Sequence, residues 1–295
     1  MLLKIDSAWL EYSQCMLILL CCAKRPLTAP ELVDAIAVEL GDLPKFNPDR
    51  RLEGVDAIYE VCPGFIEVDE QPFGEAPLVR IAHFSVQEYL ESERILQHKV
   101  AKFSIKKRKA HTDIACICLT YLLSMSVDPK EEYPLALYAA KTWHEHLRDG
   151  DKSIYLVQHQ TLQLFQNTTD FENWVSIWNI DDYSGKKPAG KIPSSIYYAS
   201  RLGLDLVLSK LFSGSVASSS SSGLSLAEVS TDINAQGGWY GNALQAASAQ
   251  GHEAIVRQLL DKGADINAQG GRYGNALQAA LARGQRSHRV AAARQ

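Results

Sequence analysis

The sequence predicts a mainly α-helical protein in three parts: three helices with a β-hairpin, a helical spacer, and a short array of stacked repeats. Apolar residues recur at steps of three and four over most of the chain, as on helix faces. Two apolar runs around a turn-rich segment interrupt this pattern between residues 65 and 84. The segment Asp232 to Gly251 returns 33 residues later with 17 of 20 positions identical. A fixed period of this length indicates units that bury their apolar faces against one another.

Composition places the chain among ordinary globular proteins. Its 295 residues suit about two domains, or one domain and an array, with 46% apolar and 22% charged residues. A net charge of −4 argues against a chain built as a whole to bind nucleic acid. The six cysteines form no C-x-x-C pair, so we expect reduced thiols in an intracellular protein.

The most apolar segment, residues 15–23, is too short to cross a bilayer. Asp6 and Glu11 precede it, unlike the positively charged start of a secretory signal. We therefore expect no membrane association and a cytoplasmic location, with a nuclear one left open.

The first part, residues 1–97, has the order of a winged helix, three helices and then a β-hairpin. Thr28 and Glu31 have the spacing of a capping box, in which each side chain accepts from the other's backbone amide. Ser85 is expected to cap the helix that follows the hairpin. We expect helices at 8–23, 32–40, 55–62 and 85–96, and strands at 65–68 and 78–84.

The helical spacer, residues 98–190, continues the helical periodicity to about Ile180 and is punctuated by Pro and Gly. The array, residues 191–295, then follows. Its expected parts are a divergent unit at 194–212, a Ser-rich insertion at 213–230, a full unit at 232–264 and a truncated unit at 265–295.

The truncated unit departs from its neighbour beyond Gly284. A second helix should follow there, but the sequence has no counterpart of Leu259 and Leu260. A frayed, poorly packed end is expected. A shifted reading frame or an early stop would leave the same sequence.

The 33-residue unit resembles the ankyrin repeat. Asn242 and Asn275 stand where that family has the Thr that caps the first helix, and Asn can accept from the same free amides. Gly251 stands where the helix ends in a left-handed conformation. The departure is Gln for His at positions 245 and 278, which alters the turn hydrogen bonds and leaves the packing unchanged.

The repeat variant and the preceding parts together resemble the fungal NACHT–ankyrin proteins of the STAND class. Their winged helix ends in a segment matched here by residues 80–90, RIAHFSVQEYL. Their spacer carries a segment matched by Pro134 to Ala140 with Trp143 and His146. The same winged helix is often labelled GPI inositol-deacylase-like, a domain name that implies no activity. No G-x-x-x-x-G-K-[ST] occurs, so the resemblance implies the portion downstream of a NACHT domain, without its NTPase.

Patterns that suggest chemistry each have a structural explanation. Asp181 and Asp182 follow an apolar run as in a Walker B strand, but without a phosphate loop an acidic turn after a helix is favoured. His144 and His146 are two apart on a helix and cannot share a metal. His83 has no acidic or Cys neighbour, and Ser85 lacks a G-x-S-x-G elbow. We expect no catalytic, cofactor-binding or metal-binding residues, and no cofactor.

The densest basic cluster, Lys106 to Lys109, could be a nuclear-import signal or a phosphate-contacting patch. The helix in the recognition position, residues 55–62, carries Asp56 and Glu60 and no Lys or Arg. Because a helix that reads a major groove should be basic or polar, nucleic-acid binding is not expected.

Four residues fall where ankyrin fingers project: Trp239, Tyr240, Arg272 and Tyr273. Exposed aromatic and Arg side chains are typical interface anchors, although each Tyr could instead pack on the neighbouring finger. The chain is therefore interpreted as a non-catalytic interaction protein that binds protein partners through the fingers and the concave helix face, with no small-molecule substrate. Two alternatives are a regulatory partner of an intact NACHT protein acting through the winged helix, and a nuclear factor using residues 106–109.

Overall fold

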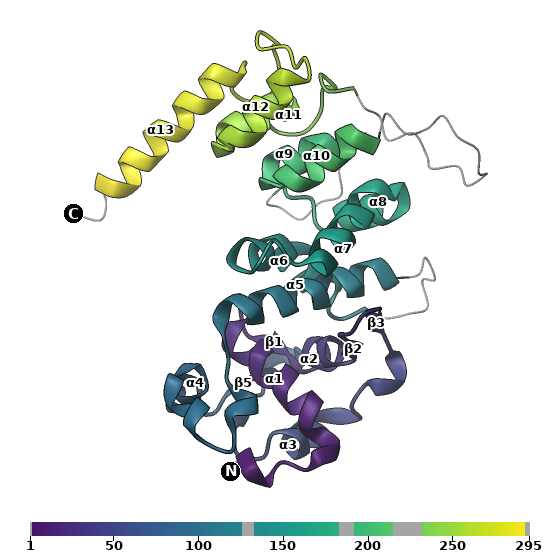
Figure 1. Ribbon diagram of the computed structural model, residues 1–295, viewed down its shortest axis with the longest axis vertical. Helices are drawn as coiled ribbons and strands as arrows, with labels where there is room; N and C mark the ends of the chain where they lie inside the picture. The colour runs from purple at the N-terminus through teal and green to yellow at the C-terminus, as the bar shows by residue number, and fades with distance from the viewer. Residues whose placement is uncertain (1, 126–132, 183–191, 215–231, 293–295) are drawn as a thin grey trace. The chain divides into compact units, whose positions relative to one another are not determined.

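A computed structural model of the chain describes residues 2–125, 133–182, 192–214 and 232–292 (Figure 1). The expected fold class, mainly helical with small sheets, is confirmed. The chain divides into two compact units, Met1–Gln160 and Thr161–Gln295. The boundary falls inside the segment expected to be the spacer, so most of its helices belong to the first unit.

The first unit begins with the winged helix. Its helices are α1 (Leu10–Cys22), α2 (Ala29–Ile36), α3 (Gly54–Val61) and α4 (Phe84–Glu91). Its three-stranded antiparallel sheet has the order β1-β5-β4, formed by Leu27–Thr28, Leu78–Ile81 and Ile66–Asp69. A separate two-stranded pair joins β2 (Val38–Glu39) to β3 (Lys45–Phe46). Short 3-10 turns lie at Leu2–Lys4, Ser7–Trp9, Pro48–Arg50, Pro72–Gly74, Glu93–Gln97 and Ala101–Phe103.

The capping box that opens α2 is present as expected. The Thr28 hydroxyl accepts from the Glu31 amide, and the Glu31 carboxylate accepts from the Thr28 amide at 2.9 Å. The hairpin also forms as expected, with Val68 opposite Val79. Residues of α1 (Met16, Leu17), α2 (Leu32), α3 (Ile58) and β5 (Val79) are at most 1% exposed and form the core beneath it.

Three expectations about this unit need correction. α2 ends at Ile36 rather than Leu40, because Val38 and Glu39 leave the helix to pair with β3. β5 ends at Ile81, and α4 begins at Phe84. Its N-cap is therefore His83 and not Ser85: Nδ1 of His83 accepts from the Ser85 amide at 3.1 Å. An imidazole nitrogen can accept from a free helical amide as a Ser oxygen does.

The rest of the first unit is a helix pair. α5 (Lys107–Ser124) packs along α6 (Ala136–Asp149) and also contacts α1 and β3. α7 (Tyr155–Gln166) spans the boundary between the units.

The second unit holds α8 (Thr168–Ile177) and the repeats. α9 (Ser195–Leu202) packs on α10 (Asp205–Gly214), and α11 (Ala243–Gln250) packs on α12 (Glu253–Asp261). α11 also contacts α9 and the last helix, α13 (Ala276–Ala292). Gly203 and Gly251 end the first helix of each pair with φ of 77° and 68°, the left-handed conformation expected for Gly251.

The last unit departs from its neighbour beyond Gly284, where the sequence also departs. α13 passes through Gly284 as one helix of 17 residues, and the chain does not reverse there (Figure 1). The first helix of the unit is thus extended, and a second helix is absent from the described part of this unit.

Candidate protein-binding surface

The two ankyrin fingers, residues 232–241 and 265–274, each close in a tight glycine turn. The Gly237 amide donates to the Gly241 carbonyl at 2.7 Å, and Gly270 donates to Gly274 at 2.8 Å. Since Gly241 and Gly274 have φ of 103° and 82°, side chains other than Gly would strain these turns. The turns place residues 239–240 and 272–273 at equivalent positions on adjacent fingers.

Trp239 and Arg272 form the outer part of the fingertips. The Arg272 guanidinium carbon lies 4.8 Å from the centroid of the Trp239 ring, a cation–π contact, and its amide donates to the Trp239 carbonyl at 3.0 Å. Trp239 is 47% exposed and Arg272 is also exposed. Two exposed side chains of types that often anchor interfaces are therefore held together at the surface.

Tyr240 and Tyr273 pack between the fingers. Their rings are stacked with centroids 6.0 Å apart, and Tyr240 is only 6% exposed. The Arg201 guanidinium carbon lies over the Tyr240 ring, 5.0 Å from its centroid, and Gln250 donates to the Tyr240 hydroxyl at 3.0 Å. The four residues expected to bind a partner thus divide into an exposed pair and a packed pair.

Gln245 explains what Gln does in place of the family's His. Its Nε2 lies within 3.0–3.3 Å of the carbonyl oxygens of Ala268, Gly270 and Gly274, all on the next finger. The side chain is 1% exposed. One buried amide therefore ties the first helix of the full unit to the following fingertip.

Asp181, which sequence patterns suggested as a Walker-like acid, anchors the array. It follows the end of α8 at Ile177, and its carboxylate pairs with Arg201. It also accepts from the Tyr197 hydroxyl at 2.7 Å and from the Trp239 amide at 3.0 Å. Both carboxylate oxygens of Asp181 therefore have partners within the fold, and the hydrogen bond from the Trp239 amide holds the first fingertip in place.

His146 lies in a buried cluster that the sequence patterns did not reveal. Its Nδ1 is 2.9 Å from Nδ1 of His111, and its Nε2 is 2.9 Å from the Tyr138 hydroxyl. Burial, and then the nearby His111 and Lys24 charges, lower the pKa of His146 to about 3, so it is neutral at physiological pH. Among the residues that the structure describes, no group of three His, Cys, Asp or Glu side chains could hold a metal ion.

The basic run lies at the start of α5, and three of its four cations form ion pairs. Lys107 pairs with Glu91 at 3.0 Å, Arg108 with Asp151 at 3.6 Å and Lys109 with Asp113 at 2.6 Å. Asp56 and Glu60 are exposed on α3, as the sequence indicated. The candidate recognition helix therefore has an acidic outer surface.

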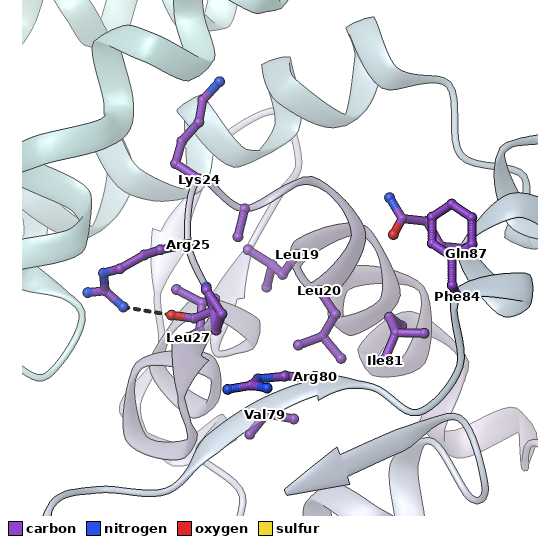
Figure 2. Close-up of a pocket in the computed structure, with 12 residues that line it drawn as sticks. Leu19, Leu20, Lys24, Arg25, Leu27, Val79, Arg80, Ile81, Phe84 and Gln87 are labelled. Carbon is purple, nitrogen blue, oxygen red and sulfur yellow. Dashed lines mark hydrogen bonds between the residues drawn. The ribbon is translucent and has the colours of Figure 1, made fainter. Parts of the chain in front are cut away.

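The winged helix contains a cavity of about 410 Å³ (Figure 2). Leu20, Leu27 and Ile81 contribute to its apolar wall, and Lys24, Arg25 and Arg80 add positive charge. These cations pair with Asp149, Glu31 and Asp69 respectively. The described residues that line it include no carboxylate, imidazole, hydroxyl or thiol. No sequence pattern pointed to it, because its walls come from α1, β1, β5 and α4.

Comparison with known proteins identifies two domains. The family described as "GPI inositol-deacylase, winged helix domain" matches residues 5–106, and the family "Ankyrin repeat" matches residues 242–271. The chain carries a winged-helix domain and an ankyrin repeat. This combination is that of a protein-interaction module.

A curated relative adds a biological context. "Azaphilone pigments biosynthesis cluster protein L" of Monascus ruber is 40% identical over 281 residues, which cover 89% of this chain and 57% of the relative. The chain thus spans a little over half the length of that protein. The search of solved structures finds no match. None of the helices in the described residues has the length and apolar character needed to span a membrane.

Proposed function

We propose that this chain is a non-catalytic binding protein whose ankyrin fingertips, with the concave helix face beside them, take a protein partner. Trp239 and Arg272 are the anchors. The observation that carries this proposal is their exposed stack at the tips of adjacent fingers. Trp and Arg are the residue types most enriched among the side chains that dominate interface energies.

The packed tyrosines support the anchors and contribute less contact area. Tyr240 and Tyr273 are stacked, and Arg201 and Asp181 hold the inner side of the finger. Such support limits the side-chain freedom that Trp239 and Arg272 would lose on binding, which favours affinity.

The non-catalytic role is supported by the surroundings of the titratable groups. Asp181 and His146 are buried in internal contacts, and the described residues that line the cavity of the winged helix include no carboxylate, imidazole, hydroxyl or thiol. By its winged helix, its spacer and its repeat, we also propose that the chain corresponds to the part of a NACHT–ankyrin protein that follows the NTPase. The fungal relative is aligned over 57% of its own length.

A second candidate is a regulatory partner that acts through the winged helix. The cavity beside β5 favours it, because Phe84 at its edge is 68% exposed. The ion pairs of residues 107–109 argue against the nuclear alternative, since their charges are already partly neutralised within the fold.

The two candidates are separated by quantitative pull-downs with the full chain as bait. We expect the double variant W239A/R272A to recover at least about tenfold less partner than the wild type, as for hot-spot residues. Its melting temperature should be unchanged. The matched control is Y155A/R148A, which removes an exposed Tyr and Arg from the first unit (78% and 67% exposed). If recovery instead falls only in F84D, binding belongs to the winged helix and the fingertip proposal fails.

A further inference from the structure

We propose that α13 offers a second binding surface, which receives an amphipathic helix of a partner protein as α11 receives α12. The surface is formed by Leu277, Gln278, Ala280 and Leu281, called here the terminal face. It lies on the helix, away from the fingertip pair. This proposal rests on the proposed function in one respect only, namely that the chain binds other proteins.

The internal repeat provides a measure of what is uncovered. Leu277 is 70% exposed, whereas its counterpart Leu244 is 3% exposed. Leu281 is 60% exposed, whereas its counterpart Ser248 is 9% exposed. Gln278 and Ala280 are exposed as well, and the equivalent Gln245 and Ala247 are at most 1% exposed. The same helix face is thus buried in one unit and open in the next.

The preceding unit shows what fits there. α12 packs on α11 with Ile255 and Leu259 1% and 0% exposed, two aliphatic side chains one helical turn apart. The next finger covers Gln245 through its three carbonyl oxygens. A helix with aliphatic residues at i and i+4, followed by a turn that presents carbonyl oxygens, is therefore complementary to this face.

The terminal face stays open because the chain does not turn at Gly284. At Gly251 a φ of 68° reverses the chain and brings α12 back onto α11. At Gly284 the helix continues to Ala292 (Figure 1). Within the described residues, the position equivalent to α12 is unfilled.

The replacement of Ser by Leu points to an apolar occupant. Of the three differences between the two copies, Ser248 to Leu281 makes the open helix more apolar than the covered one. Two leucines one turn apart and more than half exposed form a stripe that a partner's aliphatic side chains can cover. An amphipathic helix with the pattern of α12 supplies such side chains.

The test uses the full chain and a fluorescein-labelled peptide with the sequence of residues 251–264, GHEAIVRQLLDKGA. We expect saturable binding by fluorescence anisotropy, weakened at least about tenfold in L277D/L281D. The control L137D changes a leucine that is 45% exposed on α6 and should bind as wild type. A peptide with Asp in place of Ile255 and Leu259 should not bind. Equal affinity of L277D/L281D and wild type would overturn the proposal.

Because short peptides form helices only marginally in water, a covalent version keeps the test decisive. In it, residues 285–295 are replaced by the sequence of residues 252–264. We expect a higher melting temperature and slower hydrogen exchange in α13, both abolished by L277D/L281D; an unchanged melting temperature would refute the surface. W239A/R272A should bind the peptide as wild type, which separates this proposal from the fingertip one. If sedimentation velocity showed a dimer that L277D/L281D abolishes, the occupant of the terminal face would be a second copy of this chain, and the proposal of a partner's helix would be wrong.

Discussion

The Asp181 carboxylate and the Arg201 guanidinium form a buried ion pair in which the side chains are 8% and 6% exposed. The pair joins the loop after α8 to α9, and through the Trp239 amide it also holds the first finger. Its second partner, Tyr197, has its pKa raised by burial and then by the Asp181 charge, so the hydroxyl remains a donor. One carboxylate thus connects three segments of the second unit.

Replacement of Asp181 by Asn should destabilise the second unit strongly. The variant leaves the Arg201 charge buried without its counter-ion, a change that typically costs about 3–5 kcal/mol. Chemical denaturation followed by tryptophan fluorescence measures it. The control E253Q alters a carboxylate that is 87% exposed and should behave as wild type. Equal stabilities of the two variants would show that the pair is not structural.

Gln245 and Gln278 occupy the same position in successive units and should differ in effect. Q245A removes the side-chain amide nitrogen that lies within hydrogen-bond distance of three carbonyl oxygens of the next finger, and we expect a loss of about 1–3 kcal/mol. Amides in residues 265–275 should exchange faster with solvent. Q278A should leave both the stability and the exchange rates unchanged because its side chain is exposed. A similar loss in both variants would contradict this assignment.

Tyr121 should be important for the stability of the first unit. Its hydroxyl donates to the carboxylate of Asp34, which is 1% exposed and also accepts from Arg51 at 2.6 Å. Y121F leaves that carboxylate one donor short, and we expect about 1.5–3 kcal/mol of lost stability in urea denaturation. Y59F, at a site that is 40% exposed, is the matched control. An unchanged Y121F would mean that Arg51 alone satisfies Asp34.

His146 should make the first unit less stable as the pH falls. Its pKa is near 3 in the folded chain and about 6.5 in the unfolded chain, so between these values the unfolded state binds more protons. The contribution of the neutral imidazole is fully present above pH 6.5 and is lost as the pH falls toward 3. His111, Lys24, Asp149 and His144 are titratable groups that face His146.

The measurement compares urea midpoints at pH 7 and pH 4.5. The free energy of unfolding obtained from these urea curves should be lower at pH 4.5 than at pH 7. We expect H146Q to reduce this difference in free energy by on the order of 1–2 kcal/mol. H159Q, which alters an exposed histidine on α7, should keep the wild-type difference. The same difference in H146Q and wild type would place the titration elsewhere.

Local motifs were enough to predict the starts and ends of several elements. The Thr28–Glu31 capping box, the Asn242 cap, which accepts from the Gln245 amide at 2.9 Å, and the left-handed Gly251 all form as expected. Each depends on residues within a few positions of one another, and the chemistry of those residues decides the geometry. β1 was missed because two residues, Leu27–Thr28, are too few to show an alternating pattern.

The contacts that define the buried polar clusters and the candidate site depend on long-range packing. Tyr121 meets Asp34 across 87 positions, and His111 meets His146 across 35. No spacing rule reveals such pairs. The different environments of Trp239 and Tyr240 also depend on such packing. Both residues were expected at a fingertip, but only the contacts with Tyr273 and Arg201 show that Tyr240 turns inward.

Gly284 shows how a similar preceding sequence can lead to a different structure. It follows the same helix as Gly251 but stays helical. The reversal at Gly251 is stabilised by the burial of Ile255 and Leu259 against α11, and the residues after Gly284 lack such a pair. Glycine permits the turn, and the following apolar residues decide whether it forms.

Because Trp239 and Arg272 differ while the residues around them are identical, the pairing of two different fingers matters. A duplication of either unit beside itself would bring Trp against Trp or Arg against Arg, and the second arrangement places two like charges together. The cation–π contact needs a Trp on one finger and an Arg on the adjacent one. A sequence exchange that made the two copies identical would therefore remove the contact, so it depends on the single difference between the two fingers.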